Sequence, residues 1–283
     1  MIYSSMALPE KEYIQIVPKY YALRSEWIKL SFRERLLSLC YCIAGRRKNF
    51  ILTGPTACIV LGIAMLDRAE FRPHAICTTH KKSEFIYWHH RTKLPDITTV
   101  DGLLVVNAVT AIIDMTLFVT PESLLVSIND CLHNKVFSKE ELLAELKRNA
   151  RIKGCVRLER IIRFATDKCE SPLETTAWIA IYKAGFVLPQ QQVKISIGQG
   201  KSARVDMYWE FGGRKIILEL DGRVKYDDGR VLYDEKIRED KLRVMGYEVI
   251  RCVWEDVHNG DLIQILANAD IPRRRRFGRK FTS

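Results

Sequence analysis

The sequence lacks any hydrophobic run long enough to cross a membrane. Its most apolar stretch, ACIVLGIAML at 57–66, is about half of the roughly 20 residues that a membrane-spanning helix needs. The first residues, MIYSSMALPEKEY, also lack the basic-then-apolar order of a signal peptide. We therefore expect a cytoplasmic protein that does not associate with a membrane.

Cysteine pairs with the CxxC spacing of zinc sites are also missing. The eight cysteines are scattered and mostly lie in apolar patterns, so we expect reduced thiols in the core rather than disulfides. Cys77, His80, His89 and His90 could be drawn as a zinc site, but without CxxC-type spacing solvated or phosphate-binding histidines are favoured. TGPTA at 53–57 follows an apolar run, yet no Gly-Lys-Ser/Thr comes after it, which excludes a P-loop.

Positive charge is concentrated at two places in the chain. The formal net charge is +11, of which residues 1–170 carry +7. Residues 171–270 hold 14 basic and 16 acidic residues, and the tail RRRRFGRK at 273–280 adds six basic ones. Basic flanks around a slightly acidic centre suit a protein that binds a polyanion at its edges and a cation at its middle. Plain solubility is the alternative.

A length of 283 residues predicts two domains, each large enough to hold a core. Residues 1–168 are predicted to form a basic, mainly helical domain that binds DNA or a partner. Apolar spacing predicts helices over 24–45, after Pro55, in VVNAVTAIIDM, in PESLLVSINDCLHNKVFSKEELLAELKR and over 154–166. PHAICTTH and EFIYWHHR are expected to form paired strands.

Residues 169–270 are predicted to form a second domain, followed by a basic tail at 271–283. SPLETTAWIAIYKAG has a Ser171 N-cap, Pro172 at the first helical position and Gly185 at its end. Strands are expected in QQVKISI, ARVDMYWE, RKIILELD and YEVIRCVW, and helices in YDEKIREDKLRVM and after EDVHNGD. The fold class is therefore α/β (α+β), with a mixed sheet flanked by helices.

The Gly212-Gly213 pair is a strong signal for a two-residue hairpin turn. Counting back from that turn pairs Phe211 with Arg214 and places Asp206 opposite Glu219, with β-carbons about 5 Å apart. Asp221 lies two residues further along the same face. Three carboxylates are thus expected to meet on strands that are otherwise apolar.

Like charges placed opposite one another destabilise a sheet, so something must neutralise these carboxylates. A raised pKa, or an ion pair with a nearby lysine or arginine, would be enough. A divalent cation is the other solution, because a pocket of hard oxygen atoms suits Mg²⁺ or Mn²⁺. Such an ion can polarise a phosphodiester and lower the pKa of an attacking water. The residues alone leave these alternatives open.

Several motifs in order resemble a known family. RVDMYW, IILELDGRVKY and EKIREDKLRVMGYEVIRCVWEDV, together with SPLE, are similar over 171–258 to the uncharacterised family related to very-short-patch-repair endonucleases, in the PD-(D/E)XK nuclease superfamily. Residues 50–165 more weakly resemble AbiEi-type antitoxin proteins, through TGPTACIVLGI, VNAVTAIIDM and SINDCL. The resemblance implies a restriction-endonuclease-like second domain and a winged-helix-like first domain.

The resemblance makes Asp206 and Glu219 the metal-binding carboxylates. It gives Glu174 the place of the superfamily's first-helix acid, although SPLE is also a capping box. Asp221 stands where the superfamily motif usually has its lysine, and Lys225 stands where many relatives have a histidine. Positive charge for a bound nucleic acid would come from six further residues: Lys236, Arg238, Arg273, Arg274, Arg275 and Arg276.

The resulting interpretation is an Mg²⁺- or Mn²⁺-dependent DNA endonuclease. Asp206 and Glu219 would hold the metal, Asp221 and Glu174 would support them, and Lys225 would stabilise charge at the attacked phosphate or orient water. The alternative is a non-cleaving DNA-binding regulator or antitoxin-like protein with a toxin or defence-system partner. A protein–protein module of a defence locus is the third possibility.

Overall fold

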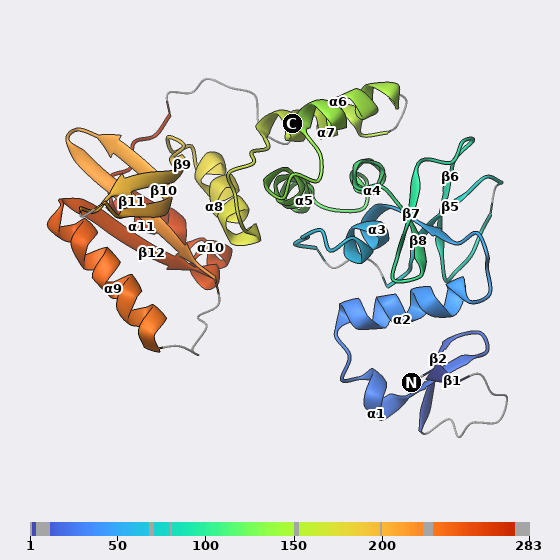
Figure 1. Cartoon of the computed structure of the whole chain (residues 1–283). Coiled ribbons are helices and arrows are strands. Elements are labelled where there is room, and N and C mark those ends of the chain that lie inside the picture. Colours follow the sequence, from blue (N-terminus) through green and yellow to red (C-terminus); the bar gives the residue numbers. More distant parts are fainter. Residues whose placement is uncertain are drawn as a thin grey trace. The chain divides into compact units, whose positions relative to one another are not determined.

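The computed structural model describes residues 2–3, 12–67, 71–79, 81–149, 153–198, 200–222 and 229–274, with the backbone alone at 2–3 and 229–235. The chain divides into two compact units, Met1–Ala165 and Thr166–Ser283, and has an α+β fold with mixed sheets (Figure 1). Among the described residues, no helix is both long and apolar enough to cross a membrane.

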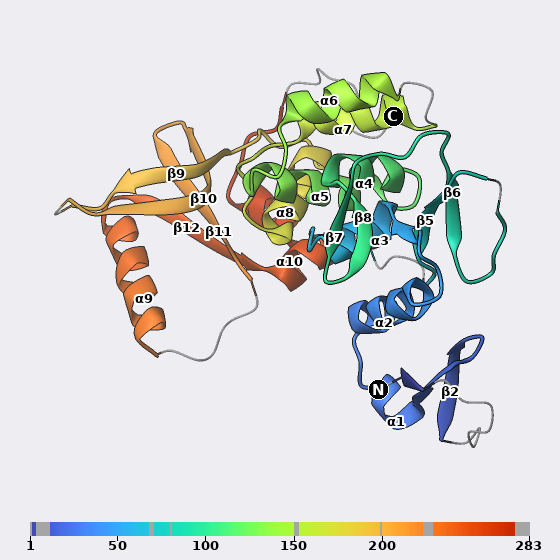
Figure 2. The same ribbon diagram turned by 45° about the vertical axis from the view of Figure 1, so that its right-hand side comes forward.

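The first unit combines helices with two sheets. A three-stranded sheet has the order β1-β3-β2, and a five-stranded sheet has the order β6-β5-β4-β8-β7. Helix α2 lies between the two sheets (Figure 2). The strands are β1 (Ile2–Tyr3), β2 (Tyr13–Val17), β3 (Tyr20–Leu23), β4 (Ile51–Leu52), β5 (His74–Cys77), β6 (Tyr87–His90), β7 (Ile97–Val100) and β8 (Leu103–Val106).

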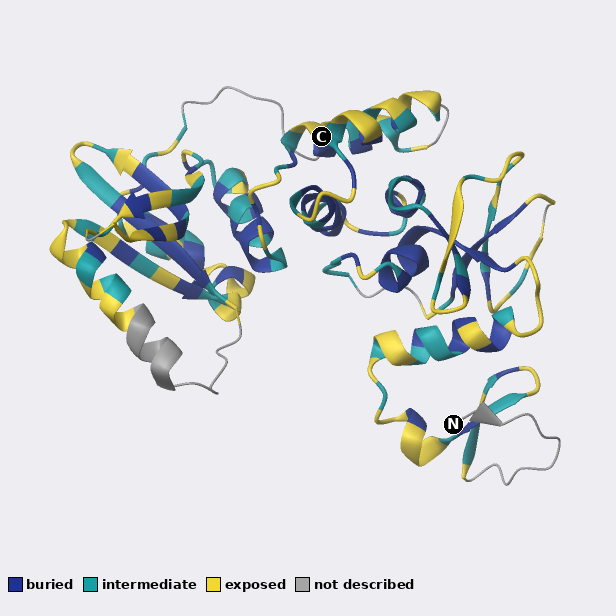
Figure 3. Ribbon diagram, in the orientation of Figure 1, coloured by how far each residue is buried: buried dark blue, intermediate teal, exposed yellow. Residues whose placement is uncertain are grey.

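Several helices of the first unit begin at a side-chain N-cap. Ser31 and Glu34 form a reciprocal capping box at the start of α2, and Thr120 caps α5 before a proline. Buried residues are concentrated in α3, α4 and α5 (Figure 3). The helices are α1 (Arg24–Trp27), α2 (Phe32–Ala44), α3 (Gly54–Val60), α4 (Ala108–Met115), α5 (Pro121–His133), α6 (Lys139–Arg148) and α7 (Cys155–Phe164).

The second unit is built on a four-stranded mixed sheet with the order β12-β11-β10-β9. Strands β11 and β12 are parallel, and the other neighbours are antiparallel. The elements are α8 (Pro172–Lys183), β9 (Gln190–Ser196), β10 (Ser202–Phe211), β11 (Arg214–Asp221), α9 (Gly229–Val244), β12 (Tyr247–Val253), α10 (Trp254–Asn259) and α11 (Asp261–Asn268).

Helices cover both faces of this sheet. Apolar residues of α8, α10 and α11 pack with Met207, Leu218 and Cys252 on one face. Leu242 of α9 packs with Ile217 on the other face. The expected mixed sheet flanked by helices is therefore confirmed.

The hairpin register predicted from Gly212-Gly213 is confirmed over five residue pairs, from Phe211–Arg214 to Met207–Leu218. Both glycines have positive φ, +57° and +78°, as a two-residue type I′ turn requires. The turn therefore sets which side chains of β10 and β11 share a face.

Replacing Gly213 with valine is expected to lower the free energy of unfolding by about 1–2 kcal/mol, because a β-branched residue is disfavoured at φ +78°. Urea unfolding measures this change. Gly222→Val is the matched control, since Gly222 lacks a positive φ and no described atom lies within 4 Å of an added β-carbon. Equal effects of the two substitutions would contradict the assigned turn.

Several expectations need correction. The first unit holds two sheets beside its helices, so the description as mainly helical omitted the strands β2, β3, β7 and β8. In the second unit, helix α10 occupies WEDVHN, whereas the sequence pattern had placed Trp254 in the strand YEVIRCVW and a helix only after EDVHNGD. The Val253 backbone N–H donates to the Asp256 carboxylate at 2.8 Å and so caps this helix. All eight cysteines are free thiols, and seven are buried, as predicted.

Candidate functional site

Asp206 lies where the hairpin of β10 and β11 opens. The pairing of β10 with β11 ends at Met207–Leu218, one position before Asp206 and Glu219 would pair. Instead, the Asp206 carboxylate accepts a hydrogen bond of 2.8 Å from the backbone N–H of Leu220. Val205 packs on the α9 face of the sheet and Met207 on the opposite face, so β10 turns over at Asp206. This turn frees a carboxylate from the regular sheet.

Gln192 lies at the matching position of β9. Its neighbours Val193 and Gln191 pair with Val205 and Met207, which places Gln192 opposite Asp206. It has a left-handed backbone, φ +55°, uncommon for a residue other than glycine. The side-chain amide donates to Glu174 at 3.0 Å and also hydrogen-bonds Asp206. Its Oε1 is buried and has no hydrogen-bond partner among the described residues.

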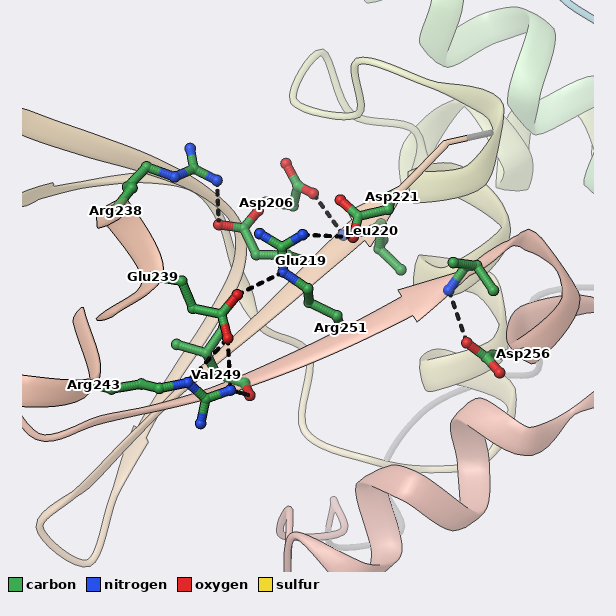
Figure 4. A network of polar contacts seen from close by, with 11 residues as sticks. Asp206, Glu219, Leu220, Asp221, Arg238, Glu239, Arg243, Val249, Arg251 and Asp256 are labelled. Carbon is green, nitrogen blue, oxygen red and sulfur yellow. Dashed lines mark hydrogen bonds and ion pairs between the residues drawn. The ribbon is translucent and has the colours of Figure 1, made fainter. Parts of the chain in front are cut away.

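Glu219 and Asp221 lie on the α9 side of the sheet, each beside an arginine (Figure 4). Arg238 of α9 contacts Glu219 at 3.2 Å. Arg251 of β12 contacts Asp221 at 3.1 Å and also Glu239 of α9 at 2.9 Å. The Glu219 side chain is only 8% exposed, whereas those of Arg238, Arg251 and Asp221 are each about one-third exposed. The cluster therefore combines a buried acid with accessible charges of both signs.

The carboxylates influence one another. Burial raises the pKa of Glu219 to about 7, and the nearby Asp206 charge adds to this rise. The positive charges of Arg238 and Arg251 lower the pKa and so oppose the rise. Burial likewise raises the pKa of Asp206, the hydrogen bonds from Leu220 and Gln192 lower it, and the Asp221 charge raises it. These acids are held closer together than their charges favour. A proton or a cation would relieve the repulsion.

Glu174 is used at the start of α8. The Ser171 hydroxyl accepts from the Glu174 N–H at 3.1 Å and donates to its Oε1 at 3.0 Å. The other carboxylate oxygen accepts from the Glu170 N–H and from Gln192, both at 3.0 Å. The predicted capping box is thus modified, because Glu174 bonds the N–H before the N-cap. Burial raises the pKa of Glu174, and the Asp206 charge adds to it.

Ser171→Ala is expected to cost about 1 kcal/mol of unfolding free energy, since α8 loses its N-cap. Thermal or urea unfolding measures this. Ser202→Ala, at an exposed position at the start of β10, is the control. A variant as stable as the control would contradict the capping role.

The other predicted site residues fall into three groups. Lys225, Arg275 and Arg276 lie outside the described residues. Lys236 is exposed on α9. Arg273 and Arg274 donate to the Ala184 and Tyr182 carbonyls, and their guanidiniums lie over the Phe186 and Tyr182 rings. These two arginines therefore satisfy carbonyls at the end of α8. Their role toward nucleic acid stays a prediction.

The described part of the chain contains no preformed metal site with three protein ligands. No three His, Cys, Asp or Glu side chains there are close enough to hold one ion as they stand. Of the histidines and the cysteine considered for zinc, His80 lies outside the described residues. Cys77 donates its thiol to the His89 carbonyl, and the His89 imidazole hydrogen-bonds His74.

The carboxylate cluster consists of Asp206, Glu219 and Asp221 with the side chains that contact them. Two of these contacting residues, Gln192 and Arg251, were not predicted from the sequence. Gln192 belongs to the run PQQQV, in which nothing distinguishes one glutamine from the next. Arg251 is the parallel-strand neighbour of Glu219, a pairing that depends on the crossover through α9. YEVIRCV has no regular alternation of polar and apolar residues, because Arg251 falls on the same side of the strand as Tyr247 and Val249, so the sequence held no signal for Arg251.

Comparisons with family models, curated proteins and solved structures find no match to this chain. The support for the candidate site therefore comes from its geometry and charge.

Proposed function

We propose that the chain is a divalent-metal-dependent endonuclease that hydrolyses phosphodiester bonds of DNA. The observation that carries this proposal is the meeting of Asp206 and Glu219 where the hairpin opens, with the pKa of Glu219 raised to about 7 by burial and by Asp206. Two acids held together against their repulsion are a known arrangement for catalysis and for cation binding.

The donor atoms fit Mg²⁺ or Mn²⁺. Asp206 and Glu219 supply carboxylate oxygens, and the buried Oε1 of Gln192 lacks a partner among the described residues. Oxygen donors of this kind are those that hard divalent cations prefer, and Mg²⁺ commonly keeps several waters beside one or two carboxylates. A partial ligand set is therefore compatible with the ion, and Asp206 and Glu219 would hold it.

When bound, the ion would polarise the scissile phosphate and lower the pKa of an attacking water. The remaining tasks fall to the chain. The accessible guanidiniums of Arg238 and Arg251 would attract the phosphate, and Asp221 would orient Arg251. Lys225, outside the described residues, keeps the charge-stabilising role that the resemblance implies.

A second candidate is a non-cleaving DNA-binding regulator or antitoxin-like protein, with a toxin or defence-system partner. The ion pairs of Arg238 with Glu219 and of Arg251 with Asp221 favour it, because they neutralise the carboxylates without a metal. Asp221 also replaces the cation expected beside the metal in the superfamily that the sequence resembles. Eight free thiols support a reducing, cytoplasmic location for either candidate.

The deciding experiment incubates the full-length protein with supercoiled plasmid and Mg²⁺ or Mn²⁺, with EDTA as the control. The endonuclease predicts nicked or linear DNA that disappears with EDTA. DNA binding that weakens steeply with salt, without any cleavage, would overturn the first proposal in favour of the second. No appreciable binding at about 0.1 M salt would exclude both and leave a protein–protein module.

A further inference from the structure

A cleft in the first unit carries positive charge over an apolar floor. It has a volume of about 230 Å³ and lies between the turn that joins β2 to β3, the end of α2 and the segment 83–86. Val17, Ile43 and Ile86 are buried at the cleft, and Phe85 is 44% exposed beside them. Arg46 and Arg47, both exposed, complete the lining. We call this feature the Arg46–Arg47 cleft.

The two guanidiniums are oriented by aromatic rings rather than by acids. Arg46 lies 4.3 Å from the centre of the Tyr20 ring and donates to the Pro18 carbonyl at 2.8 Å. Arg47 lies 5.6 Å from the centre of the Trp88 ring. Neither arginine forms an ion pair with a carboxylate in the described part of the chain. Their charge is therefore held in place and remains available to an anion.

Further cations adjoin the cleft. The Lys81 ammonium lies 5.1 Å from the centre of the Trp88 ring. Lys48 follows Arg47 in the chain, and Lys82 precedes the lining residue Ser83; both lysines are exposed. Glu84 is the one acidic residue within the segment 81–86. The excess of basic over acidic residues matches a chain of phosphates rather than a single carboxylate.

We propose that the Arg46–Arg47 cleft binds single-stranded DNA, with one unpaired base in the apolar cavity and the flanking phosphates on the arginines and neighbouring lysines. The cavity is smaller than the roughly 300–1,000 Å³ of sites that enclose drug-sized ligands, so it suits one planar ring system. Phe85 offers that base an apolar contact, and cations beside aromatic rings are typical of strand-binding surfaces. The acidic side chains of a peptide would supply charge but no planar ring. This site is separate from the carboxylate cluster and does not depend on the proposed cleavage.

Binding of a labelled 12-nucleotide DNA strand to the full-length protein, measured by fluorescence anisotropy in EDTA, tests the proposal. Arg46→Glu with Arg47→Glu is expected to weaken binding at least about tenfold at 0.1 M salt. The control is Lys147→Glu with Arg160→Glu, which makes the same charge change at exposed positions of α6 and α7. If the first pair fails to fold, Arg46→Gln with Arg47→Gln replaces it. Equal losses for the charge-reversal and control pairs would overturn the site.

The base pocket has its own test. A strand with abasic sites throughout keeps the phosphates and is expected to bind at least about fivefold more weakly than the normal strand. Phe85→Ala should remove most of that difference without affecting the abasic strand. Equal affinity for the two strands would overturn the base pocket, and preference for an RNA strand by tenfold or more would overturn the assignment to DNA. Loss of binding to anionic phospholipid vesicles, with strand binding unchanged in Arg46→Glu with Arg47→Glu, would point to a membrane instead.

Because EDTA removes divalent ions, this assay is blind to cleavage. Strand binding without nuclease activity would leave the cleft proposal intact and remove the proposed catalytic function. If Arg46→Glu with Arg47→Glu changes neither cleavage nor strand affinity, the catalytic function stands and the cleft proposal falls. The two proposals therefore fail separately.

Discussion

Asp206→Asn is expected to lower metal-dependent DNA cleavage at least about 100-fold, which corresponds to about 2.7 kcal/mol of transition-state stabilisation. Asparagine has nearly the same shape, and its side-chain oxygen can still accept the N–H of Leu220, so the opened hairpin should persist. The lost charge is the one that faces Glu219. A cation held by two carboxylates should therefore bind much more weakly.

The cleavage assay with supercoiled plasmid measures this loss, and Glu255→Gln is the control because Glu255 is an exposed acid of the same unit. Without metal, Asp206→Asn should be at least as stable as the native chain, since Asp206 raises the pKa of Glu219 through like-charge repulsion. Cleavage within threefold of the native rate would show that Asp206 does not hold the ion.

Glu219→Gln is expected to stabilise the metal-free protein at pH 8 by up to about 3 kcal/mol and to change little at pH 5. The pKa of Glu219 is about 7 in the folded protein against 4.5 as its ordinary value, because it is buried beside Asp206. Between about pH 4.5 and pH 7, the folded state binds more protons than the unfolded state. The free energy of unfolding therefore falls as pH rises from about 4.5 to about 7, and is level above that.

Urea unfolding in EDTA at several pH values, for the native chain and the variant, isolates this contribution as a difference. The native chain should lose stability relative to Glu219→Gln across this window. Adding Mg²⁺ at pH 8 should restore stability to the native chain and leave the variant unchanged, because an ion that binds only the folded state stabilises it. A difference independent of pH would refute the raised pKa of Glu219.

Local signals in the sequence predicted the elements of the second unit well. Gly212-Gly213 determines the hairpin register because glycine adopts the positive φ that both turn positions require without strain. Ser171 and Pro172 predicted the start of α8 in the same direct way. Each depends on residues next to one another in the chain.

The carboxylate cluster could be predicted only in part. Counting along the hairpin brought Asp206 to the level of Glu219, but could not show that β10 turns over at Asp206 and that its carboxylate takes the Leu220 N–H. The partners Arg238 and Arg251 come from α9 and from a parallel strand beyond it. Their approach depends on how the crossover packs on the sheet, which local pattern does not encode.

In the first unit, even less of the structure could be predicted from local sequence pattern. Strands β7 and β8 are short and separated by Asp101-Gly102, a turn with positive φ at both residues, yet only one of them has a continuous apolar pattern. The Arg46–Arg47 cleft joins three segments that are distant in sequence. Neither feature has a periodic signal long enough to be distinguished from a loop.

Anomalous scattering from a crystal soaked in Mn²⁺ tests the metal site most directly. The account predicts one strong peak in contact with carboxylate oxygens of both Asp206 and Glu219, at about the 2.0–2.3 Å of a divalent ion bound to oxygen. The peak should be absent from crystals of Asp206→Asn soaked in the same way. A soaked native crystal with no peak at these two residues, and with Arg238 still paired to Glu219, would contradict the proposed metal centre.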